Sequence, residues 1–594
     1  MNRILLFLSV ALPAWAMEYH VATNGNDSAA GSLTAPWRTI QKAANTATPG
    51  ATVYVWPGTY NEKITINVTG PLALIGTNGP VVSGAGRPGQ NLIYIANKSG
   101  ITIEGFVLRD NTGVTDGSGI RFEGAGSNLT FRANRIHNIR GSNAMGITVY
   151  ATSGTQPVTN LVIAGNEVFD CDAAPSEAIT LNGNVTGFRI ESNYVHDVNN
   201  IGIDMIGGEG MAPANDVTRH GVCRGNRVER ARSSYGGGYA AGIYVDGGRD
   251  IIVENNVVTE CDLGIEVGCE NRGLIASNVI VRSNLIYSND KAGLVFGGYA
   301  SNVGRVNNCQ FLFNTLVGND TLGTGNGELW MQHASNNVVA GNIIVSTAQN
   351  LLLSSISGSR SNRLDYNLWY CPGGSNTARF VWRGTTYTGF NAYRTGSQQD
   401  AHSQFANPLL TNFHLRVLSP AVDAGPPDYW PAAGETDLDG QPRRTGPRPD
   451  CGADELSAFD AWRVEQFSPA QLANESHSGA TADPDADGVV NLLEYAFRTE
   501  PLASNDTSRL PVVGLTIPST TRYLTLTYRQ NKAATDLVFE PQAAGALTNG
   551  AWSSTGVVEI GREDAGDWWR VTARDSVPVN AAQQRFMRLR VRNP

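Results

Sequence analysis

The chain has 594 residues, 66 of them glycine and only 16% of them charged, a composition typical of a turn-rich β protein. Its length allows more than one domain. The formal net charge of −9 excludes the basic surface that nucleic-acid binding requires, so we expect no nucleic acid among its partners.

The N-terminus has the layout of a secretory signal peptide. A basic start at Asn2-Arg3 precedes an apolar run from Ile4 to Leu12 and the small-residue cleavage pattern Ala14-Trp15-Ala16. No later stretch has about twenty consecutive apolar residues, the length that a membrane-spanning helix needs. We therefore expect residues 1–16 to be removed, and the mature chain to be a secreted or periplasmic monomer without a membrane partner.

An asparagine recurs along most of the chain, at intervals that run from 25 residues (Asn342 to Asn367) to 33 residues (Asn193 to Asn226). A short alternating apolar strand precedes each one, and a Gly-Ile or Gly-Leu word usually follows. The asparagines are Asn134, Asn166, Asn193, Asn226, Asn256, Asn284, Asn314, Asn342 and Asn367, and the words begin at Gly146, Gly202, Gly242, Gly264 and Gly293.

Short strands between Gly and Asn turns, without a helical period, exclude βαβ units. A repeat of this length with two or three strands is typical of a solenoid whose coils stack at about 4.8 Å. The recurring Asn suits a turn position in the left-handed conformation, and its amide can bond to the next Asn in the stack. The sequence therefore predicts a right-handed parallel β-helix over residues 17–456.

The N-terminal end of the repeat carries a further pattern. Residues 37–44 have helical spacing and would cover the end of the core, and residues 51–60 read as a first strand and turn. With the opening residues 19–27, they resemble the pectate-lyase-like superfamily of secreted carbohydrate-active β-helices, which includes lyases and β-xylosidase-type glycosidases. The resemblance is close over residues 18–66 and general over the coils. It implies a polysaccharide or oligosaccharide substrate, and it specifies the fold better than the reaction.

The repeat stops at residues 450–455, where the composition changes. Residues 457–505 read as a helical linker with a Ser, Ala and Asp-rich connector. Residues 506–594 contain alternating strands such as 523–528 and 585–591, which predict a small C-terminal β-sandwich-like accessory domain.

Stacking the Gly-Ile words aligns equivalent residues in columns. Because each Ile points into the core, the next residue points outward. One outward column reads Thr148, Thr180, Asp204, Tyr244, Glu266 and Val295, and the next reads Tyr150, Asn182, Ile206, Asp246, Gly268 and Gly297.

Three carboxylates, Asp204, Asp246 and Glu266, thus converge on successive coils, and we interpret them as the acid, the base and the supporting group of a catalytic site. Two coils separate Asp204 from Glu266, roughly 9.6 Å, and Asp246 lies roughly 8 Å from each of them. These separations overlap the roughly 6.5–9.5 Å expected of an inverting glycosidase, and the reach of the side chains leaves a retaining arrangement open. The plainer interpretation is that they are only solvated surface groups.

Two long loops, residues 207–220 and 230–239, border these acids, and irregular loops on a regular scaffold often carry function. Glu209 lies in the first of them. We expect the substrate to contact the polar and aromatic side chains of these loops and of the neighbouring strands, namely Arg219, His220, Arg232, Tyr235, Tyr239, Tyr244 and Glu270.

These residues allow three functions. A glycoside hydrolase is the first hypothesis. A polysaccharide lyase of the pectate or alginate type is the second: it needs a base, for which Arg219, His220 or Lys291 could serve, and a cation, for which the acids could hold a second Ca²⁺. It ranks lower because lysine is scarce along the coils. A non-catalytic carbohydrate-binding β-helix is the third, but it would need an aromatic stripe along the groove.

A calcium loop is the sharpest single motif. Residues 483–494 match the pattern D-x-D-x-D-G-x5-E at every position. We expect a structural Ca²⁺ there, with the carbonyl of Val489 completing a ligand set of Asp483, Asp485, Asp487, Asn491 and Glu494.

Overall fold

The computed structural model describes residues 17–593, except residues 234, 505–506, 548–551 and 580–583. The predicted signal peptide therefore lies outside the described residues. The chain divides into two compact units, the first ending at Ala406 and the second beginning at Asn407. No helix of the described residues is long and apolar enough to cross a membrane.

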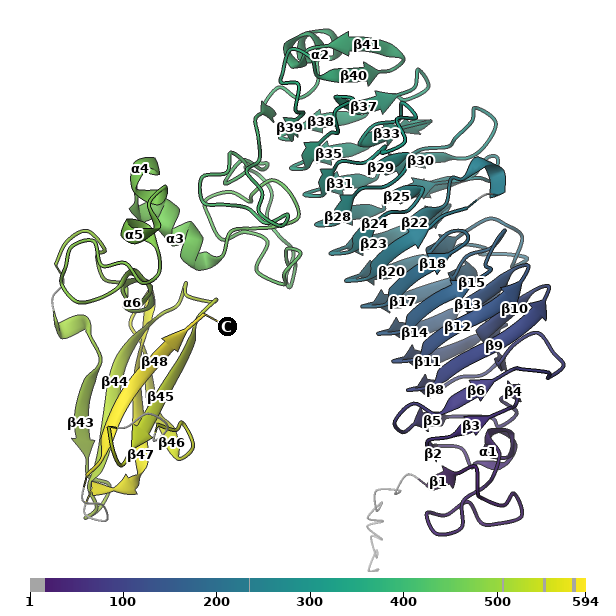
Figure 1. The fold of residues 1–594 in the computed structure, drawn as a ribbon, viewed down its shortest axis with the longest axis horizontal. Coiled ribbons are helices and arrows are strands. Elements are labelled where there is room, and N and C mark those ends of the chain that lie inside the picture. The colour runs from purple at the N-terminus through teal and green to yellow at the C-terminus, as the bar shows by residue number, and fades with distance from the viewer. Residues whose placement is uncertain (1–16, 234, 505–506, 548–551, 580–583, 594) are drawn as a thin grey trace, which may run out of the picture. The chain divides into compact units, whose positions relative to one another are not determined.

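The first unit is a parallel β-helix, as the repeat predicted, and Figure 1 shows its strands stacked in order from β1 to β41. Each coil places one strand in each of three sheets. In stacking order, the first sheet contains β1 (Glu18–Val21), β2 (Ala51–Val55), β5 (Leu72–Gly76), β8 (Ile101–Glu104), β11 (Gly126–Arg132), β14 (Val158–Ala164), β17 (Val185–Glu191), β20 (Arg219–Arg224), β23 (Arg249–Glu254), β27 (Ile280–Arg282), β31 (Gln310–Leu312), β35 (Val338–Ala340) and β38 (Arg363–Asp365), with β26 (Ile275–Ser277), β30 (Arg305–Asn307) and β34 (Ala334–Ser335) beside this path.

The second sheet will carry the candidate site. Its strands are β4 (Ile64–Thr65), β7 (Ile93–Ala96), β10 (Gly117–Glu123), β13 (Ala144–Ala151), β16 (Ile179–Gly183), β19 (Ile203–Ile206), β22 (Ala241–Asp246), β25 (Leu263–Gly268), β29 (Ala292–Phe296), β33 (Leu329–Met331), β37 (Leu351–Ser355), β40 (Arg379–Trp382) and β41 (Thr385–Thr388). The third sheet contains β3 (Thr59–Tyr60), β6 (Val81–Ser83), β9 (Val107–Val114), β12 (Arg135–Gly141), β15 (Glu167–Cys171), β18 (Tyr194–Val198), β21 (Arg227–Ala231), β24 (Val257–Thr259), β28 (Leu285–Tyr287), β32 (Thr315–Val317), β36 (Ile343–Val345), β39 (Leu368–Tyr370) and β42 (Gln404–Phe405).

The recurring asparagines form a continuous buried ladder. The Nδ2 group of Asn226 donates to Oδ1 of Asn256 at 3.0 Å, and that of Asn256 donates to Oδ1 of Asn284 at 2.9 Å. The same bond joins every neighbouring pair from Asn134 to Asn367. Each Oδ1 also accepts the backbone N–H of the preceding Asn, as Asn256 does from Asn226 at 2.9 Å. The predicted ladder is therefore confirmed.

The left-handed conformation, however, lies one residue earlier than predicted. The residue before each ladder Asn has a positive φ, for example 53° at Ala133 and 51° at Ser283, whereas the ladder asparagines do not. The preceding residue makes the turn, so the Asn side chain is free to point inward and bond to its neighbours.

Both ends of the β-helix core are covered. Helix α1 (Ile40–Thr46) buries Ile40, Ala43 and Ala44, and its N-cap Thr39 accepts the Lys42 N–H. It begins later than the predicted residue 37. At the other end, α2 (Phe390–Ser397) stacks Tyr393 on Phe380 of β40, with ring centroids 4.2 Å apart.

The coils end at β42, before the predicted residue 456, and residues 407–457 contain no helix or named strand. The second unit then forms α3 (Ala458–Gln466), α4 (Pro469–Leu472), α5 (Glu475–Ser478), α6 (Asn491–Phe497) and the antiparallel strands β43 (Val512–Thr516), β44 (Tyr523–Asn531), β45 (Val538–Ala544), β46 (Val557–Asp564), β47 (Trp568–Pro578) and β48 (Phe586–Arg592). They order as β43-β44-β47-β46 and β45-β48, so the predicted small C-terminal β domain is confirmed. Phe459 and Tyr495 of the helices share its core with Leu537.

Replacing Asn256 by Ala should destabilise the β-helix by about 2–4 kcal/mol, because it leaves the buried amide groups of Asn226 and the carbonyl of Cys223 without their partner. Urea unfolding followed by circular dichroism measures this loss. The control is Asn61→Ala on the exposed surface, which should change stability by less than about 0.5 kcal/mol. Equal effects of the two variants would contradict a structural role of the ladder.

Candidate active site

The strand register of the second sheet aligns the outward residues in the column that the sequence predicted. It pairs Thr148 with Thr180, Thr180 with Asp204, Asp204 with Tyr244, Tyr244 with Glu266 and Glu266 with Val295. The neighbouring outward position pairs Tyr150 with Asn182, Asn182 with Ile206 and Asp246 with Gly268. The register also places Trp330 beside Val295, which extends the column by one residue that the sequence analysis missed. Trp330 follows Leu329 directly, without the Gly-Ile word that marked the other coils.

The column opens into a pocket of about 670 Å³. Its lining contains six carboxylates and no Lys, Arg or His among the described residues. The acids are Asp204, Asp246 and Glu266 from the strands and Glu177, Glu209 and Glu270 from the connections, with Tyr235, Tyr239, Tyr244, Tyr299 and Trp330 as the aromatic lining. The structure therefore brings the three predicted catalytic residues together in one cavity.

Two of these strand acids are buried, which contradicts the interpretation as solvated surface groups. Asp204 is 2% exposed and Asp246 is 3% exposed. Residues of the connections, among them Glu177, Tyr235 and Tyr299, line the pocket together with the strand residues, so these outward positions form a pocket floor. Glu177 was not anticipated, because it precedes β16 in an irregular connection that lacks any repeat signal.

Few donors reach the acids. Thr180 Oγ1 donates to Glu177 at 2.8 Å, and Asn182 Nδ2 donates to Glu209 at 2.7 Å. The backbone N–H of Glu270 donates to Asp246 Oδ1 at 2.8 Å. Asp204 Oδ1 is buried and has no hydrogen-bond partner among the described residues. A carboxylate without donors is poorly suited to carry a charge, so Asp204 favours the protonated form.

Burial and like charge both favour protonation across the pocket. Burial, then the charges of Glu177 and Asp246, raise the pKa of Asp204 well above its usual value. Burial followed by the Glu270 charge does the same to the pKa of Asp246 and of Glu266. Burial raises the pKa of Glu177 to about 7, with the Glu209 charge adding to it. The acids therefore titrate as a group that still holds protons near neutral pH.

Hydrogen bonds to two further aspartates shape the loops around the pocket. Asp216 accepts the N–H groups of Gly210 and Ala212 at 2.6 and 3.1 Å, which holds the turn that presents Glu209. Asp262 Oδ2 accepts the N–H groups of Ser233 and Ala240 at 2.8 and 3.0 Å. These two hydrogen bonds join the ends of the loop that carries Tyr235 and Tyr239.

The structure separates the predicted binding residues into two sets. Tyr235, Tyr239, Tyr244 and Glu270 line the pocket, whereas Arg219, His220 and Arg232 do not. After its excursion over residues 207–217 the chain returns into β20 of the first sheet, which carries Arg219 and His220 to another face of the coil.

The three basic residues outside the pocket have other partners. The Arg219 guanidinium donates to Asn184 Oδ1 at 3.1 Å, and His220 is exposed, 3.9 Å from Asp250. Arg232 pairs with Asp290, with Nε and Oδ2 2.7 Å apart. Lys291 lies closer to the lining, since its Nζ donates to the Gly237 carbonyl at 2.5 Å and lies 3.8 Å from the Tyr239 ring centroid.

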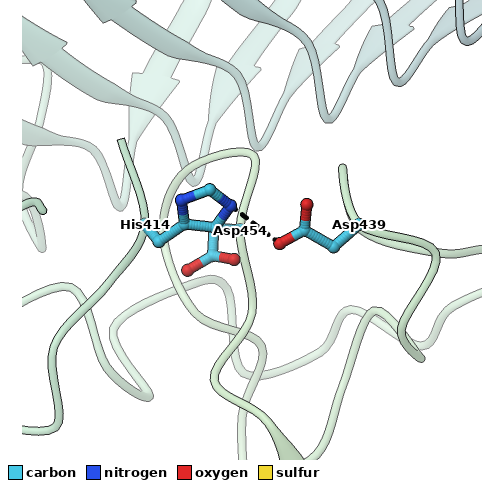
Figure 2. A group of neighbouring side chains, drawn as sticks. All are labelled: His414, Asp439 and Asp454. Carbon is cyan, nitrogen blue, oxygen red and sulfur yellow. Dashed lines mark ion pairs between the residues drawn. The ribbon is translucent and has the colours of Figure 1, made fainter. Parts of the chain in front are cut away.

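Two groups of three potential metal ligands occur in the described residues, and both belong to the second unit. One is Asp483, Asp485 and Asp487 of the predicted calcium loop. The other, drawn in Figure 2, is His414, Asp439 and Asp454. The pocket acids form no such group. The described residues therefore contain no preformed three-ligand cluster for the second Ca²⁺ suggested at the active site.

The group in Figure 2 is satisfied as an ion pair. His414 Nδ1 donates to the Asn412 carbonyl at 2.8 Å, and Nε2 lies 2.9 Å from Asp439 Oδ2. Burial lowers the pKa of His414, but the carboxylates of Asp439 and Asp454 outweigh it and raise that pKa overall. The protonated imidazole thus provides the positive charge that this cluster requires.

Comparison with known proteins gives a family but no activity. Residues 23–78 match the family described as "Protein of unknown function (DUF1565)". The uncharacterized protein YwoF of Bacillus subtilis (strain 168) is 32% identical over 431 residues, which cover 68% of this chain and 91% of that protein. The chain belongs to the YwoF family.

A shorter match reaches a named enzyme. Pectate lyase PEL9 of Emericella nidulans is 35% identical over 68 residues, which cover 11% of this YwoF-family chain and 17% of the lyase. The match is too short to transfer an activity. The three parallel sheets of the first unit form the β-helix that the resemblance of the N-terminal residues implied.

Solved structures with similar folds include the complex of XylC with xylose, with a TM-score of 0.39 and 11% identity over 66% of this chain and 87% of XylC. Pectate lyase Pel9A has a TM-score of 0.37 and 15% identity, covering 74% and 96% of the two chains. The alginate lyase of Paenibacillus sp. str. FPU-7 has a TM-score of 0.36 and 15% identity, covering 50% and 94%. At these scores the likeness carries no argument about the reaction.

Replacing Asp204 by Asn should stabilise the folded chain at neutral pH. The pKa of Asp204 is higher in the folded chain than in the unfolded chain, where it is about 4. The contribution of Asp204 to folding stability is therefore fully present below about pH 4 and is lost as the pH rises through its folded-state pKa. The amide does not ionise, so the variant should be more stable by roughly 0.5–2 kcal/mol at neutral pH, with little gain in acid.

Urea unfolding of both proteins at about pH 5 and about pH 7.5 measures this difference. Asp250→Asn is the control, since that side chain lies on the surface near His220. An identical pH dependence in wild type and Asp204→Asn would show that Asp204 is not held in the protonated form.

Proposed function

We propose that the YwoF-family chain is a glycoside hydrolase that acts outside the cytoplasm on a poly- or oligosaccharide. One observation supports this above the others: a pocket floored by neighbouring carboxylates whose pKa values burial raises, with no basic side chain in its described lining. Cleaving a glycosidic bond needs one carboxyl that donates a proton and another that acts as a base or nucleophile.

The hydrogen bonds favour particular roles for the acids. Asp246 receives the Glu270 N–H, which stabilises its ionised form, so it suits the base or nucleophile. Asp204 has an oxygen without a donor, so it suits the proton donor to the leaving oxygen. Glu266 lies two coils from Asp204 with Tyr244 between them, and it would support the charge that develops on the sugar.

The aromatic lining suits a saccharide. Tyr235 and Tyr239 are 62% and 49% exposed, and the Tyr239 ring centroid lies 6.4 Å from that of Trp330. Exposed rings on one side of an acidic floor provide apolar faces on which a pyranose ring can stack while its hydroxyls bond to carboxylates. The absence of basic residues from the described lining favours a neutral or cationic sugar over a polyuronate.

A polysaccharide lyase is the second candidate, and the segment shared with pectate lyase PEL9 is the observation that favours it. A lyase must neutralise a uronate and remove the C5 proton. Lys291, whose Nζ lies at the Tyr239 ring, is then a candidate base beside the lining, whereas Arg219 and His220 lie outside it. The acidic lining would repel a uronate without a bound cation, so we rank elimination below hydrolysis.

Replacing Asp246 by Asn, or Glu266 by Gln, should lower the rate on the natural glycan by at least about a hundredfold, because an amide neither accepts nor donates the transferred proton. A panel of polysaccharides identifies the substrate, and the release of reducing ends measures the rate. The surface variant Asp250→Asn should keep wild-type activity.

The products distinguish the classes. New reducing ends without ultraviolet absorbance indicate hydrolysis, whereas absorbance of a 4,5-unsaturated uronate indicates elimination and would refute the hydrolase proposal. Near-wild-type activity of both amide variants would place the active site elsewhere. Binding without turnover of any glycan would favour a carbohydrate-binding β-helix.

Replacing Trp330 by Ala should raise KM by roughly tenfold with a smaller effect on kcat, because the ring is expected to hold the sugar without taking part in proton transfer. Steady-state kinetics with the substrate from the panel gives both constants. Trp56→Ala, far along the chain at the first coil, is the control and should leave KM unchanged. A fall in kcat alone would contradict a stacking role.

A further inference from the structure

The loop between α5 and α6 folds around its own acidic side chains. Asp483 Oδ1 and Asp485 Oδ1 each accept the Asp487 N–H at 3.2 Å, and Asp483 Oδ2 accepts the Gly488 N–H at 2.9 Å. Gly488 has a φ of 91°, a conformation that requires glycine, at the position where calcium loops turn sharply. The backbone thus fixes three carboxylates around one point.

These carboxylates converge closely. One oxygen each from Asp483, Asp485 and Asp487 lies within 4.8 Å of the other two. Neither Asp483 nor Asp485 forms an ion pair with a described cationic side chain. Such an arrangement of like charges is unfavourable without a cation.

A buried amide gives independent evidence for a ligand. Asn491, the ninth residue of the loop, is fully buried, and its Nδ2 donates to the carbonyls of His477 and Gly479 at 3.0 and 2.9 Å. These two bonds fix the amide plane and leave Oδ1 without any partner among the described residues. Asp485 Oδ2 is likewise buried and unpaired. An unpaired buried acceptor is unfavourable, so both oxygens require a donor or a cation.

The donor set identifies the ligand. All the candidate groups are oxygens, from carboxylates, an amide and the Val489 carbonyl, and none is a thiolate or imidazole. Oxygen-only sets of six or more ligands suit Ca²⁺ better than Zn²⁺ or other transition metals. The spacing of the ligand positions within the loop is also that of a twelve-residue calcium loop.

The loop is joined directly to the core of the C-terminal β domain. Its last residue, Glu494, is fully buried in α6, and the next residue, Tyr495, donates its hydroxyl to Asp536 at 2.9 Å. Asn531 Nδ2 of β44 donates to the Tyr495 carbonyl at 2.9 Å, and Tyr495 packs in the cluster that contains Leu537. A change at the loop therefore reaches the β domain through one helix.

We propose that residues 483–494 bind one Ca²⁺, and that this ion stabilises the C-terminal domain by fixing α6 against β44. The site lies in the second unit and takes no part in the proposed hydrolysis. Binding free energy from an ion that the unfolded chain does not hold becomes folding stability. The C-terminal domain should therefore unfold at a lower temperature when Ca²⁺ is removed.

The test uses the full chain, stripped with EGTA and titrated with CaCl₂ in a calorimeter. Wild type should bind one Ca²⁺ per chain and should bind MgCl₂ much more weakly. Asp485→Asn, which keeps the shape of the side chain, should weaken Ca²⁺ binding by at least about tenfold because it removes one ligand charge. Asp439→Asn, in the cluster of Figure 2, is the matched control and should bind Ca²⁺ as wild type does.

Differential scanning calorimetry gives the second measurement. Adding Ca²⁺ should raise the melting temperature of one transition in wild type and in Asp439→Asn, but not in Asp485→Asn. If Asp485→Asn does not fold, Asp483→Asn replaces it in both measurements. The absence of Ca²⁺ binding, equal binding in the loop variants, or loss of binding in Asp439→Asn would each overturn the proposal. Neither measurement uses glycan cleavage, so a failure of the proposed activity would leave this result unaffected.

Discussion

The alignment of successive coils depends on one buried chain of side-chain amides. Each ladder asparagine donates its amide group to the asparagine of the next coil and accepts bonds from the previous coil at its Oδ1 atom, so a coil cannot slip along its neighbour without breaking several buried bonds. Main-chain pairing alone would tolerate a shift of two residues, because that shift keeps every side chain on its own face. The ladder prevents this shift, and it thereby also fixes the alignment of the side chains on the outer faces of the sheets.

The acidic pocket is a direct result of that alignment. Asp204 and Glu266 face the same direction because their strands occupy the same register, and Tyr244 of the intermediate coil keeps them apart. The loops then exclude water, which raises the pKa values of the acids and makes proton transfer possible near neutral pH. Such a cluster opposes folding, since buried like charges are unfavourable, and the rigid coils supply the stability that retains it.

The sequence was sufficient to predict the fold and the floor of the pocket, because both follow from local periodicity. Alternation of inward and outward residues placed Asp204, Asp246 and Glu266 correctly, and the spacing of the asparagines predicted the ladder. The positions of residues in the irregular connections could not be predicted from periodicity. Glu177 and Trp330 were missed, and Arg219 and His220 were misplaced, because a long loop hides the point at which the chain re-enters a sheet. The end of the coils was also placed too late, since residues 407–456 lack a repeat by which to judge it.

The left-handed residue before each ladder asparagine has a consequence for how such a chain can change in length. From Asn134 to Asn367 each coil carries its own turn residue and its own asparagine. Each of these coils is therefore a self-contained unit that accepts a bond from the previous coil and donates one to the next. Duplication or loss of complete coils beyond the acids would leave the column unbroken. Insertion of part of a coil within β19–β25 would rotate one acid out of the pocket floor. In such proteins we therefore expect insertions and deletions near the ends to comprise whole coils, and those of single residues to occur only within the loops.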